Sequence, residues 1–253
     1  SEAQKNGALV NRIKLPLLSA DSVNQIIADL LRCNLTETWE LSLIVHKKTN
    51  GNPFFIHQFL KTLYDKKALA LDPESGFKWD IDRVAEIQVT DNVVDFMAAK
   101  ISRMPDAIRD TLRICACYGN RFNLLAVAAC HGKSLEETVA NLSAAESEGL
   151  IGFKGDTGFF SHDRIREAVY RLLSAEERKQ THYLIGRFLL ENIPDTQIKD
   201  SVVDIVNHLN IAQVLISSPD ERYRLAGLNA RAGVKAMTSG AFDAALHYYH
   251  TGI

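Results

Sequence analysis

Residues 134–170, SLEETVANLSAAESEGLIGFKGDTGFFSHDRIREAVY, decide the fold of the central part of the chain. The opening Ser-Leu-Glu-Glu has the spacing of a capping box, in which a serine and a glutamate three residues later satisfy free backbone donors. This start predicts a helix over Ser134–Glu148. Gly149 is placed to end that helix, because glycine adopts the left-handed conformation of a helix C-terminus at little cost.

A small hairpin is expected directly after this helix. Two short apolar segments, Leu150–Lys154 and Gly158–Ser161, flank Gly155-Asp156-Thr157, a typical turn sequence. Helices are also expected at 92–103, 105–117, 123–131 and 163–172. Three helices followed by a two-stranded hairpin is the order of a winged helix-turn-helix, which we assign to residues 92–173.

The N-terminal part of the chain predicts a short strand and then a helical bundle. Val10–Pro16 alternates like a strand, and Pro16 ends it because proline has no N–H for the ladder. We assign residues 1–18 to the remnant of a preceding core and residues 19–91 to a helical subdomain. Its expected elements are a helix from Ser19, a helix from about Thr36, a helix over 53–66 and a hairpin over 69–80.

From residue 174 to residue 253 the pattern is helix after helix, with helices expected over 175–192, 199–215, 220–239 and 241–253. In the last pair, small residues recur where two antiparallel helices would touch, and aromatic residues recur where they would fill the gap. These positions are Gly233, Ala236, Phe242, Ala245 and Tyr249. Their spacing is typical of one tetratricopeptide-type repeat, and an array would need further repeats to be stable. The fold class expected for the whole chain is therefore mainly α.

Composition excludes several classes of protein. The 253 residues carry 29 Lys and Arg against 31 Asp and Glu, a net charge of −2, so no basic excess indicates a nucleic-acid partner. No apolar run is long enough to cross a bilayer, and the start has no signal-peptide core. The four cysteines have no zinc or redox spacing, which favours buried free thiols in a reducing compartment. We therefore expect a cytoplasmic protein with no nucleic-acid or membrane partner.

No catalytic centre is evident from motifs. The chain contains no GxxxxGK[ST], GxGxxG, HExxH or GxSxG sequence, and its eight histidines lie apart. His247 and His250 share a helix face but lack a partner carboxylate, so a metal site is not expected. These absences predict that this chain is not itself an enzyme.

Two short motifs stand out. Residues 48–55, KTNGNPFF, combine a helix end, a glycine turn and a proline-started helix, which would hold Asn52 and Pro53 at a fixed corner. Taken alone, this motif favours a rigid joint between helices. Residues 160–170, FSHDRIREAVY, place His162 where a helix begins, beside free backbone donors that favour an anion such as phosphate. Taken alone, that histidine is more often a capping residue than a ligand.

An ordered set of motifs resembles one known family. The set is IKLPLLS, KTNGNPFFIHQFL, FKWD, DNVVDFMAAKI, CYGNRF, FFSHDRIREAVY, THYLIGRFLL and VVDIVNHLN. It is similar to signal-transduction ATPases with numerous domains, the STAND branch of the AAA+ superfamily. More closely, it resembles the segment after the nucleotide core in large bacterial multi-sensor hybrid histidine kinases and related serine/threonine kinases of two-component phosphorelay signalling.

The resemblance implies roles for both motifs. The GNPFF corner belongs to the helical lid, and its proline, here Pro53 beside Asn52, packs near the nucleotide base. The histidine that ends the winged-helix domain, here His162, reaches the nucleotide phosphates in the closed, resting form. The family's Walker A lysine and Walker B carboxylates belong upstream of IKLPLLS. We therefore expect no cofactor in this segment and ATP or ADP with Mg²⁺ in a parent protein.

The partners implied are the upstream nucleotide-binding core, the downstream sensor and kinase domains, and a protein or small-molecule effector on the helical repeats. Three functions compete. The first is a regulatory segment that couples nucleotide state to partner sensing. The second is a winged-helix transcriptional regulator, but its third helix, Ser134–Glu148, carries four glutamates and no Lys or Arg, which disfavours DNA. The third, an independent enzyme, lacks a site.

Overall fold

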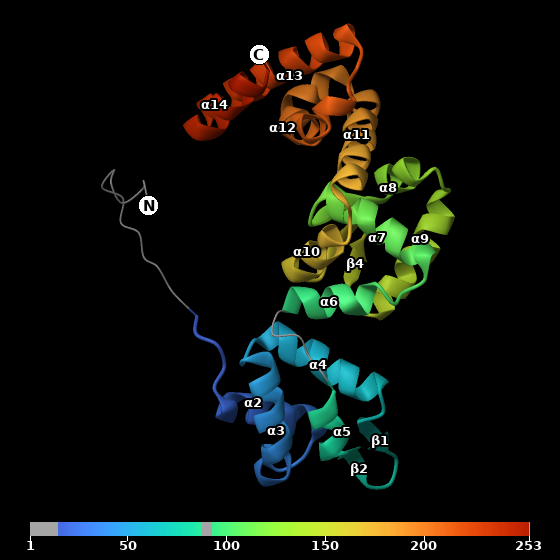
Figure 1. The fold of residues 1–253 in the computed structure, drawn as a ribbon, viewed down its shortest axis with the longest axis vertical. Helices are drawn as coiled ribbons and strands as arrows, with labels where there is room; N and C mark the ends of the chain where they lie inside the picture. The colour runs from blue at the N-terminus through green and yellow to red at the C-terminus, as the bar shows by residue number, and fades with distance from the viewer. Residues whose placement is uncertain (1–14, 88–92, 253) are drawn as a thin grey trace, which may run out of the picture. The chain divides into compact units, whose positions relative to one another are not determined.

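The computed structural model describes residues 15–87 and 93–252, and the chain divides into two compact units after Val93 (Figure 1). Both units are built mainly from helices with small antiparallel sheets, so the predicted fold class is confirmed. The finer division at residues 18, 91 and 173 stays a prediction. The strand predicted over Val10–Pro16 lies mostly outside the described residues, and so does the expected helix start at Asn92.

Over its described residues, 15–87 and 93, the first unit contains three helices, a hairpin and one short helix. Side chains satisfy free donors at the start of each of the three helices. The Ser19 and Asn52 side chains cap α2 and α4, and at the start of α3 the Glu37 carboxylate accepts from the Asn34 N–H at 3.1 Å. The bounds are α2 Ala20–Leu31, α3 Leu35–Thr49, α4 Pro53–Asp65, β1 Leu69–Asp72, β2 Gly76–Trp79 and α5 Ile81–Glu86. The predicted hairpin over residues 69–80 is present, with Leu69 opposite Trp79.

Helix α5 was not expected. It begins behind Asp80, whose side chain accepts from the Arg83 N–H at 3.1 Å. Lys48 of α3 donates to the carbonyls of Ala85 and Ile87 at 2.9 and 2.8 Å, which satisfies the end of α5. The core of this unit is formed by apolar side chains of all four helices and of the hairpin. Its buried members include Val23, Ile27, Leu41, Val45, Ile56, Phe59, Leu63, Leu69 and Val84.

The second unit opens with the elements expected of a winged helix-turn-helix. Their bounds are α6 Val93–Ile101, α7 Asp106–Tyr118, β3 Arg121–Asn123, α8 Leu124–His131, α9 Leu135–Ser147, β4 Ile151–Lys154, β5 Thr157–Phe160 and α10 Asp163–Arg171. The sheet differs from the expected two-stranded hairpin. It has three strands in the order β3-β5-β4, because Arg121–Asn123 adds a strand to the open edge of β5. Phe122 thereby packs edge-on against Phe160 in the core, with ring centroids 5.7 Å apart.

The start of α9 corrects the predicted capping box in part. The Ser134 hydroxyl accepts from the Glu137 N–H at 3.1 Å, as the spacing predicts. The Glu137 carboxylate instead pairs with Lys133 at 2.5 Å. In a capping box the Glu137 carboxylate would accept from the backbone N–H of Ser134. Here it forms an ion pair with Lys133, the residue before the cap.

Among the remaining helices, α11 packs on α7 and α8, and α12, α13 and α14 each pack on the preceding α-helix. Their bounds are α11 Ala175–Asn192, α12 Asp195–Ile211, the short 3-10 helix η1 Gln213–Leu215, α13 Pro219–Thr238 and α14 Phe242–Thr251. Helix α12 begins four residues before the predicted start, with Pro194 at its N-cap. Proline is tolerated at the start of a helix, because the N–H that it lacks would have no partner within the helix. The predicted helix over 199–215 is also interrupted at Ala212, where η1 follows.

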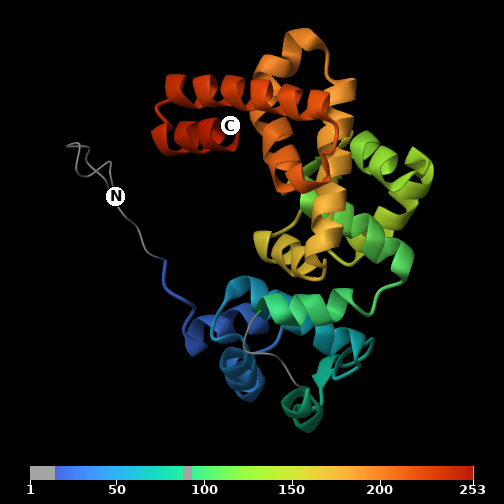
Figure 2. The ribbon, with the colours of Figure 1, turned by 45° about the horizontal axis from the view of Figure 1, so that its top comes forward.

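Helices α13 and α14 lie side by side as an antiparallel pair (Figure 2). A side chain added at Gly233 would meet the Tyr249 ring at 2.6 Å, so the predicted small-residue contact is confirmed. Ala236 and Ala245 are buried in the same contact. Phe242, expected in the gap, is 69% exposed, and Tyr248 is the buried aromatic instead, with its hydroxyl donating to Asn207 at 2.9 Å. No helix in the described part of the chain is both long and apolar enough to cross a membrane.

Candidate functional site

The corner between α3 and α4 holds Asn52 and Pro53 in a defined conformation. Asn50 and Gly51 both adopt the left-handed region, with φ of 50° and 68°, and turn the chain between the helices. The Asn52 side chain accepts from the Phe55 N–H at 3.1 Å, and Pro53 occupies the first turn of α4. The predicted rigid corner is therefore present, and the Asn52 amide oxygen is used as a helix cap.

The segment before α2 pins this corner in place. The Leu18 N–H donates to the Gly51 carbonyl at 2.9 Å, and the Leu18 carbonyl lies 3.1 Å from His46 Nε2. A side chain at Gly51 would meet the Leu18 carbonyl oxygen at 2.1 Å. The corner thus leaves no room beneath Gly51, while Pro53 is exposed on its outer side.

His162 lies in the turn between β5 and α10 and is exposed. Its Nδ1 accepts from the Arg164 N–H at 3.1 Å, so it caps α10. A neutral imidazole that accepts at Nδ1 carries its proton on Nε2. Asp163 is held by the Asn120 side chain, which joins this turn to the loop before β3.

Asn52 and Pro53 lie in the first unit, and His162 lies in the second. Their shared role in binding a nucleotide therefore stays a prediction. Each of them lies at a helix N-terminus, where unpaired N–H groups and the helix dipole favour a negative charge.

Tyr170, His182 and His208 form a chain of hydrogen bonds in the second unit. No sequence motif indicated this chain. Tyr170 Oη lies 3.2 Å from His182 Nε2, and His182 Nδ1 lies 2.8 Å from His208 Nδ1. Burial, followed by the nearby Arg166 and Arg178 guanidinium groups, lowers the pKa of His182 to about 4. Burial and then the neighbouring His182 lower the pKa of His208 to about 4. Both imidazoles are therefore neutral near pH 7.

A cleft lies beside these three residues, and His208 is part of its lining. We name it the His208 cleft. One wall consists of Tyr118 at the end of α7, Arg121 of β3 and the start of α8; the other consists of α11 and α12, including Phe188 and Asp204. Its volume is about 620 Å³. Since its residues come from positions 118–208, only the folded chain brings them together.

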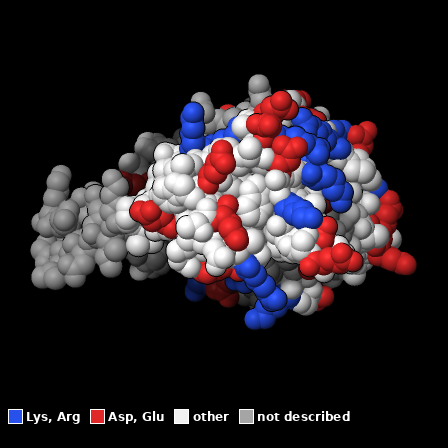
Figure 3. Space-filling model, turned by 90° about the horizontal axis from the view of Figure 1, so that it is seen from below, with Lys and Arg blue, Asp and Glu red and all other residues white. Residues whose placement is uncertain are grey.

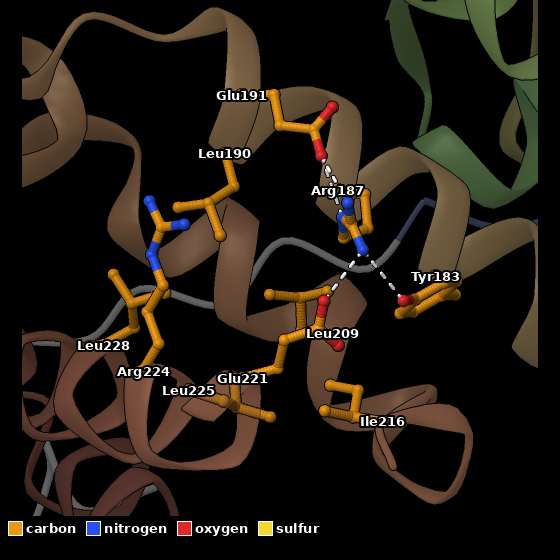
Figure 4. A pocket seen from close by; sticks show the side chains of 10 residues that line it. All are labelled: Tyr183, Arg187, Leu190, Glu191, Leu209, Ile216, Glu221, Arg224, Leu225 and Leu228. Carbon is orange, nitrogen blue, oxygen red and sulfur yellow. Dashed lines mark hydrogen bonds and ion pairs between the residues drawn. The ribbon is translucent and has the colours of Figure 1, made fainter. Parts of the chain in front are cut away.

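A second, smaller cavity of about 90 Å³ lies between α11, α12 and α13 (Figure 4). Arg187 is at its centre and bonds Glu191, Glu221 and the Tyr183 hydroxyl at 2.7, 2.9 and 3.1 Å. The hydrogen bond to the Glu191 carboxylate, followed by the one to the Tyr183 hydroxyl, raises the pKa of Arg187 above its usual value. The charge of this arginine is already neutralised, so the cluster ties helices together and offers little to a ligand.

The cysteines and histidines give no sign of a metal or thiol site within the described residues. All four cysteines are free thiols, and burial raises the pKa of Cys117 to about 12 and that of Cys130 to about 11. Thiols with such pKa values are poor nucleophiles at neutral pH. No three His, Cys, Asp or Glu side chains of the described residues gather as metal ligands would.

Comparison with known proteins relates the chain to signalling kinases. It is 27% identical over 296 aligned residues to the hybrid signal transduction histidine kinase G of Dictyostelium discoideum. The match covers 96% of this chain and 9% of that protein. No family model matches the chain, and no solved structure matches it.

The similarity extends over almost all of the chain, and so over both units and both sequence motifs. It supports a role in signal transduction. Because the chain spans about a tenth of that relative, the relative's kinase activity does not extend to this segment by comparison alone. The expected STAND architecture and the bacterial type of parent protein stay predictions.

Proposed function

We propose that this chain is a regulatory and interaction segment of a signal-transduction ATPase within a multidomain sensor kinase, acting in the cytosol. The similarity to a hybrid histidine kinase over nearly the whole chain carries this proposal. In it, the first unit is the helical lid of an upstream nucleotide-binding core. The second unit is a winged helix followed by helices that sense a protein or small-molecule effector.

The proposed nucleotide contacts fit the residues present. Pro53 is exposed on the outer side of a rigid corner and offers an apolar ring to a nucleotide base. His162, in the turn before α10, has an imidazole ring, a group that can donate a hydrogen bond to a phosphate oxygen. Bound ATP or ADP would supply the phosphates, and Mg²⁺ would be held by them and by the upstream core.

Coupling follows from the placement of these residues in separate units. A nucleotide that contacts Pro53 of the first unit and His162 of the second stabilises only the arrangement in which both reach it. Each such contact therefore biases the equilibrium between a closed and an open state. A hydrogen bond to a charged group contributes about 1.5–3 kcal/mol, which shifts that equilibrium by about ten- to a hundredfold.

His162 caps α10, so a test of nucleotide binding needs a variant that loses the imidazole but keeps the cap. Asparagine is a good helix cap, so His162→Asn keeps the cap on α10 and removes the imidazole. In a parent protein that carries the upstream core, we expect His162→Asn and His162→Ala to speed ADP release and raise basal signalling output. The matched control Lys133→Ala changes an exposed ion pair only and should leave both at the wild-type level.

Stopped-flow release of a fluorescent ADP analogue measures this effect. Wild-type release from His162→Asn, with faster release from His162→Ala, would mean that His162 is only a helix cap. Wild-type release from both variants would equally remove the clamp from the proposal.

The chain by itself should neither hydrolyse ATP nor bind it tightly, because it has no GxxxxGK[ST] loop to hold the phosphates. Titration calorimetry of the 253-residue chain with MgATP and MgADP tests this expectation. Micromolar binding that is lost in Pro53→Ala or His162→Ala would contradict it and would place a complete nucleotide site within these residues.

A further inference from the structure

The His208 cleft contains one cation and one anion that lack ion-pair partners. Among the residues that the structure describes, neither Arg121 nor Asp204 takes part in a salt bridge. Arg187 in the neighbouring cavity differs, since two carboxylates hold it. The His208 cleft therefore presents two opposite charges, from β3 and from α12, that a ligand can complement.

The interior of the cleft adds a hydrogen-bonding group and an apolar wall. His208 is 8% exposed and lines the cleft, while its Nδ1 is engaged by His182. Phe188 and Leu189 of α11 line the same space. Asp204 lies close enough to Tyr118 that its carboxylate, after burial, raises the pKa of that phenol.

The Tyr170–His182–His208 chain bears on which nitrogen of His208 carries a proton. A phenol is a better donor than a neutral imidazole N–H, so Tyr170 donates to His182 Nε2. His182 then carries its proton on Nδ1 and donates to His208 Nδ1, which leaves the His208 proton on Nε2. With the protons assigned in this way, His208, a buried residue of the cleft lining, carries an N–H at Nε2, a donor suited to an acceptor such as a carboxylate oxygen.

We propose that the His208 cleft binds a free α-amino acid with an apolar or aromatic side chain. Arg121 and the His208 Nε2–H would receive the carboxylate, Asp204 would receive the ammonium group, and Phe188 with Leu189 would contact the side chain. The cleft volume of about 620 Å³ lies within the ~300–1,000 Å³ of small-molecule sites. This ligand site is independent of the nucleotide proposal, because it uses none of Asn52, Pro53 or His162.

The probes are L-phenylalanine and two analogues that each lack one charge. Phenethylamine has no carboxylate, and 3-phenylpropanoate has no ammonium group. Titration calorimetry of the 253-residue chain should show binding of L-phenylalanine or L-leucine. Each analogue should bind about ten- to a hundredfold more weakly than L-phenylalanine, since each loses one charge-assisted contact.

Two variants assign the charges. Asp204→Asn should bind L-phenylalanine no better than 3-phenylpropanoate, because its ammonium partner is lost. Arg121→Gln should bind L-phenylalanine no better than phenethylamine. The control Asp200→Asn makes the same charge change on α12 outside the cleft lining and should retain wild-type affinity and wild-type discrimination.

Circular dichroism of each variant shows whether the fold is kept. The proposal is wrong if millimolar L-phenylalanine and L-leucine both produce no binding heat and no shift in melting temperature. It is equally wrong if Asp204→Asn and Arg121→Gln keep the wild-type preference for the zwitterion. Failure of ADP release to respond to His162→Asn would leave this inference unaffected, since the two tests use different residues and ligands.

Discussion

At the scale of single residues, Gly51 shows how one backbone position shapes the proposed nucleotide corner. Its φ of 68° is in the left-handed region, which costs a residue with a side chain about 1–2 kcal/mol. Its α-carbon also faces the Leu18 carbonyl, where an added carbon would lie 2.1 Å from the oxygen. The corner that holds Asn52 and Pro53 therefore requires glycine for two separate reasons.

We expect Gly51→Ala to reduce the free energy of unfolding of the first unit by more than ~2 kcal/mol, because it adds a clash with backbone to the cost of the left-handed φ. Gly76→Ala is the matched control, with a φ of 81° and nothing within 4 Å of the added carbon. It should lose about 1–2 kcal/mol only. Urea unfolding followed by circular dichroism measures both values, and equal losses would show that Leu18 moves aside freely.

The lowered pKa values of His182 and His208 predict that the free energy of unfolding depends on pH. The pKa of each is about 4 in the folded chain against an ordinary value of 6.5, so the unfolded chain binds more protons between these values. The contribution of the two neutral imidazoles to the free energy of unfolding is fully present above pH 6.5, and it is lost as the pH falls toward 4. The slope reaches at most ~1.4 kcal/mol per pH unit for each histidine.

Urea unfolding from about pH 7 to about pH 5 measures this slope. His182→Gln removes one of the two groups, so the slope should decrease by about half. The control His250→Gln alters an exposed histidine of α14 and should keep the wild-type slope. An unchanged slope in His182→Gln would mean that other groups, chiefly carboxylates, cause the loss of stability in acid.

At the scale of elements, the helices were predictable where their ends depend on neighbouring residues. Ser19, Asn52 and Ser174 each cap a helix through a residue three positions ahead, which the sequence displays directly. Strand β3 was missed because its partner, β5, lies more than thirty residues away and only three residues pair. The His182–His208 contact spans 26 residues between two helices, and no local pattern indicates it.

The candidate site residues also fall into those that the sequence indicates and those that it does not. Asn52, Pro53 and His162 are recognisable because each lies at a helix start with its own short motif. The His208 cleft is not, because its lining comes from five separate elements that the fold brings together. Positions on a single element are therefore predictable from the sequence, whereas surfaces shared between elements are not.

The contact between α11 and α12 yields a prediction at this scale. A side chain at Gly186 would meet the buried Leu209 at 2.6 Å, so the two helices approach closely there. We expect Gly186→Ala to lower stability by about 1–3 kcal/mol through overpacking, although alanine is the better helix former. Gly227→Ala of α13, with open space around the added carbon, should instead raise stability by about 0.5–1 kcal/mol. Thermal unfolding compares them, and a stabilised Gly186→Ala would show that the contact is loose.

At the scale of the whole molecule, the charge distribution bears on whether the chain binds DNA. On the face shown in Figure 3, acidic side chains interrupt the basic ones and no broad basic area forms. Helix α9, the predicted recognition helix of the expected winged helix, exposes Glu136, Glu137 and Glu146, and Glu148 pairs with Lys100 at 3.0 Å. The element that would enter a major groove therefore carries charges that phosphates repel.

We expect the 253-residue chain to show no measurable specific affinity for duplex DNA. Binding to DNA needs cations that displace counterions from phosphates, and such binding weakens steeply as salt increases. Fluorescence anisotropy with a labelled duplex, at low and at near-physiological salt, tests this expectation. A variant with Glu136→Lys and Glu137→Lys is a positive comparison, because it replaces two repulsive charges at the start of α9 and should gain weak, salt-sensitive binding. Nanomolar, sequence-selective binding by the wild-type chain at near-physiological salt would contradict the charge argument and would favour a transcriptional regulator over a segment that couples signals within a kinase.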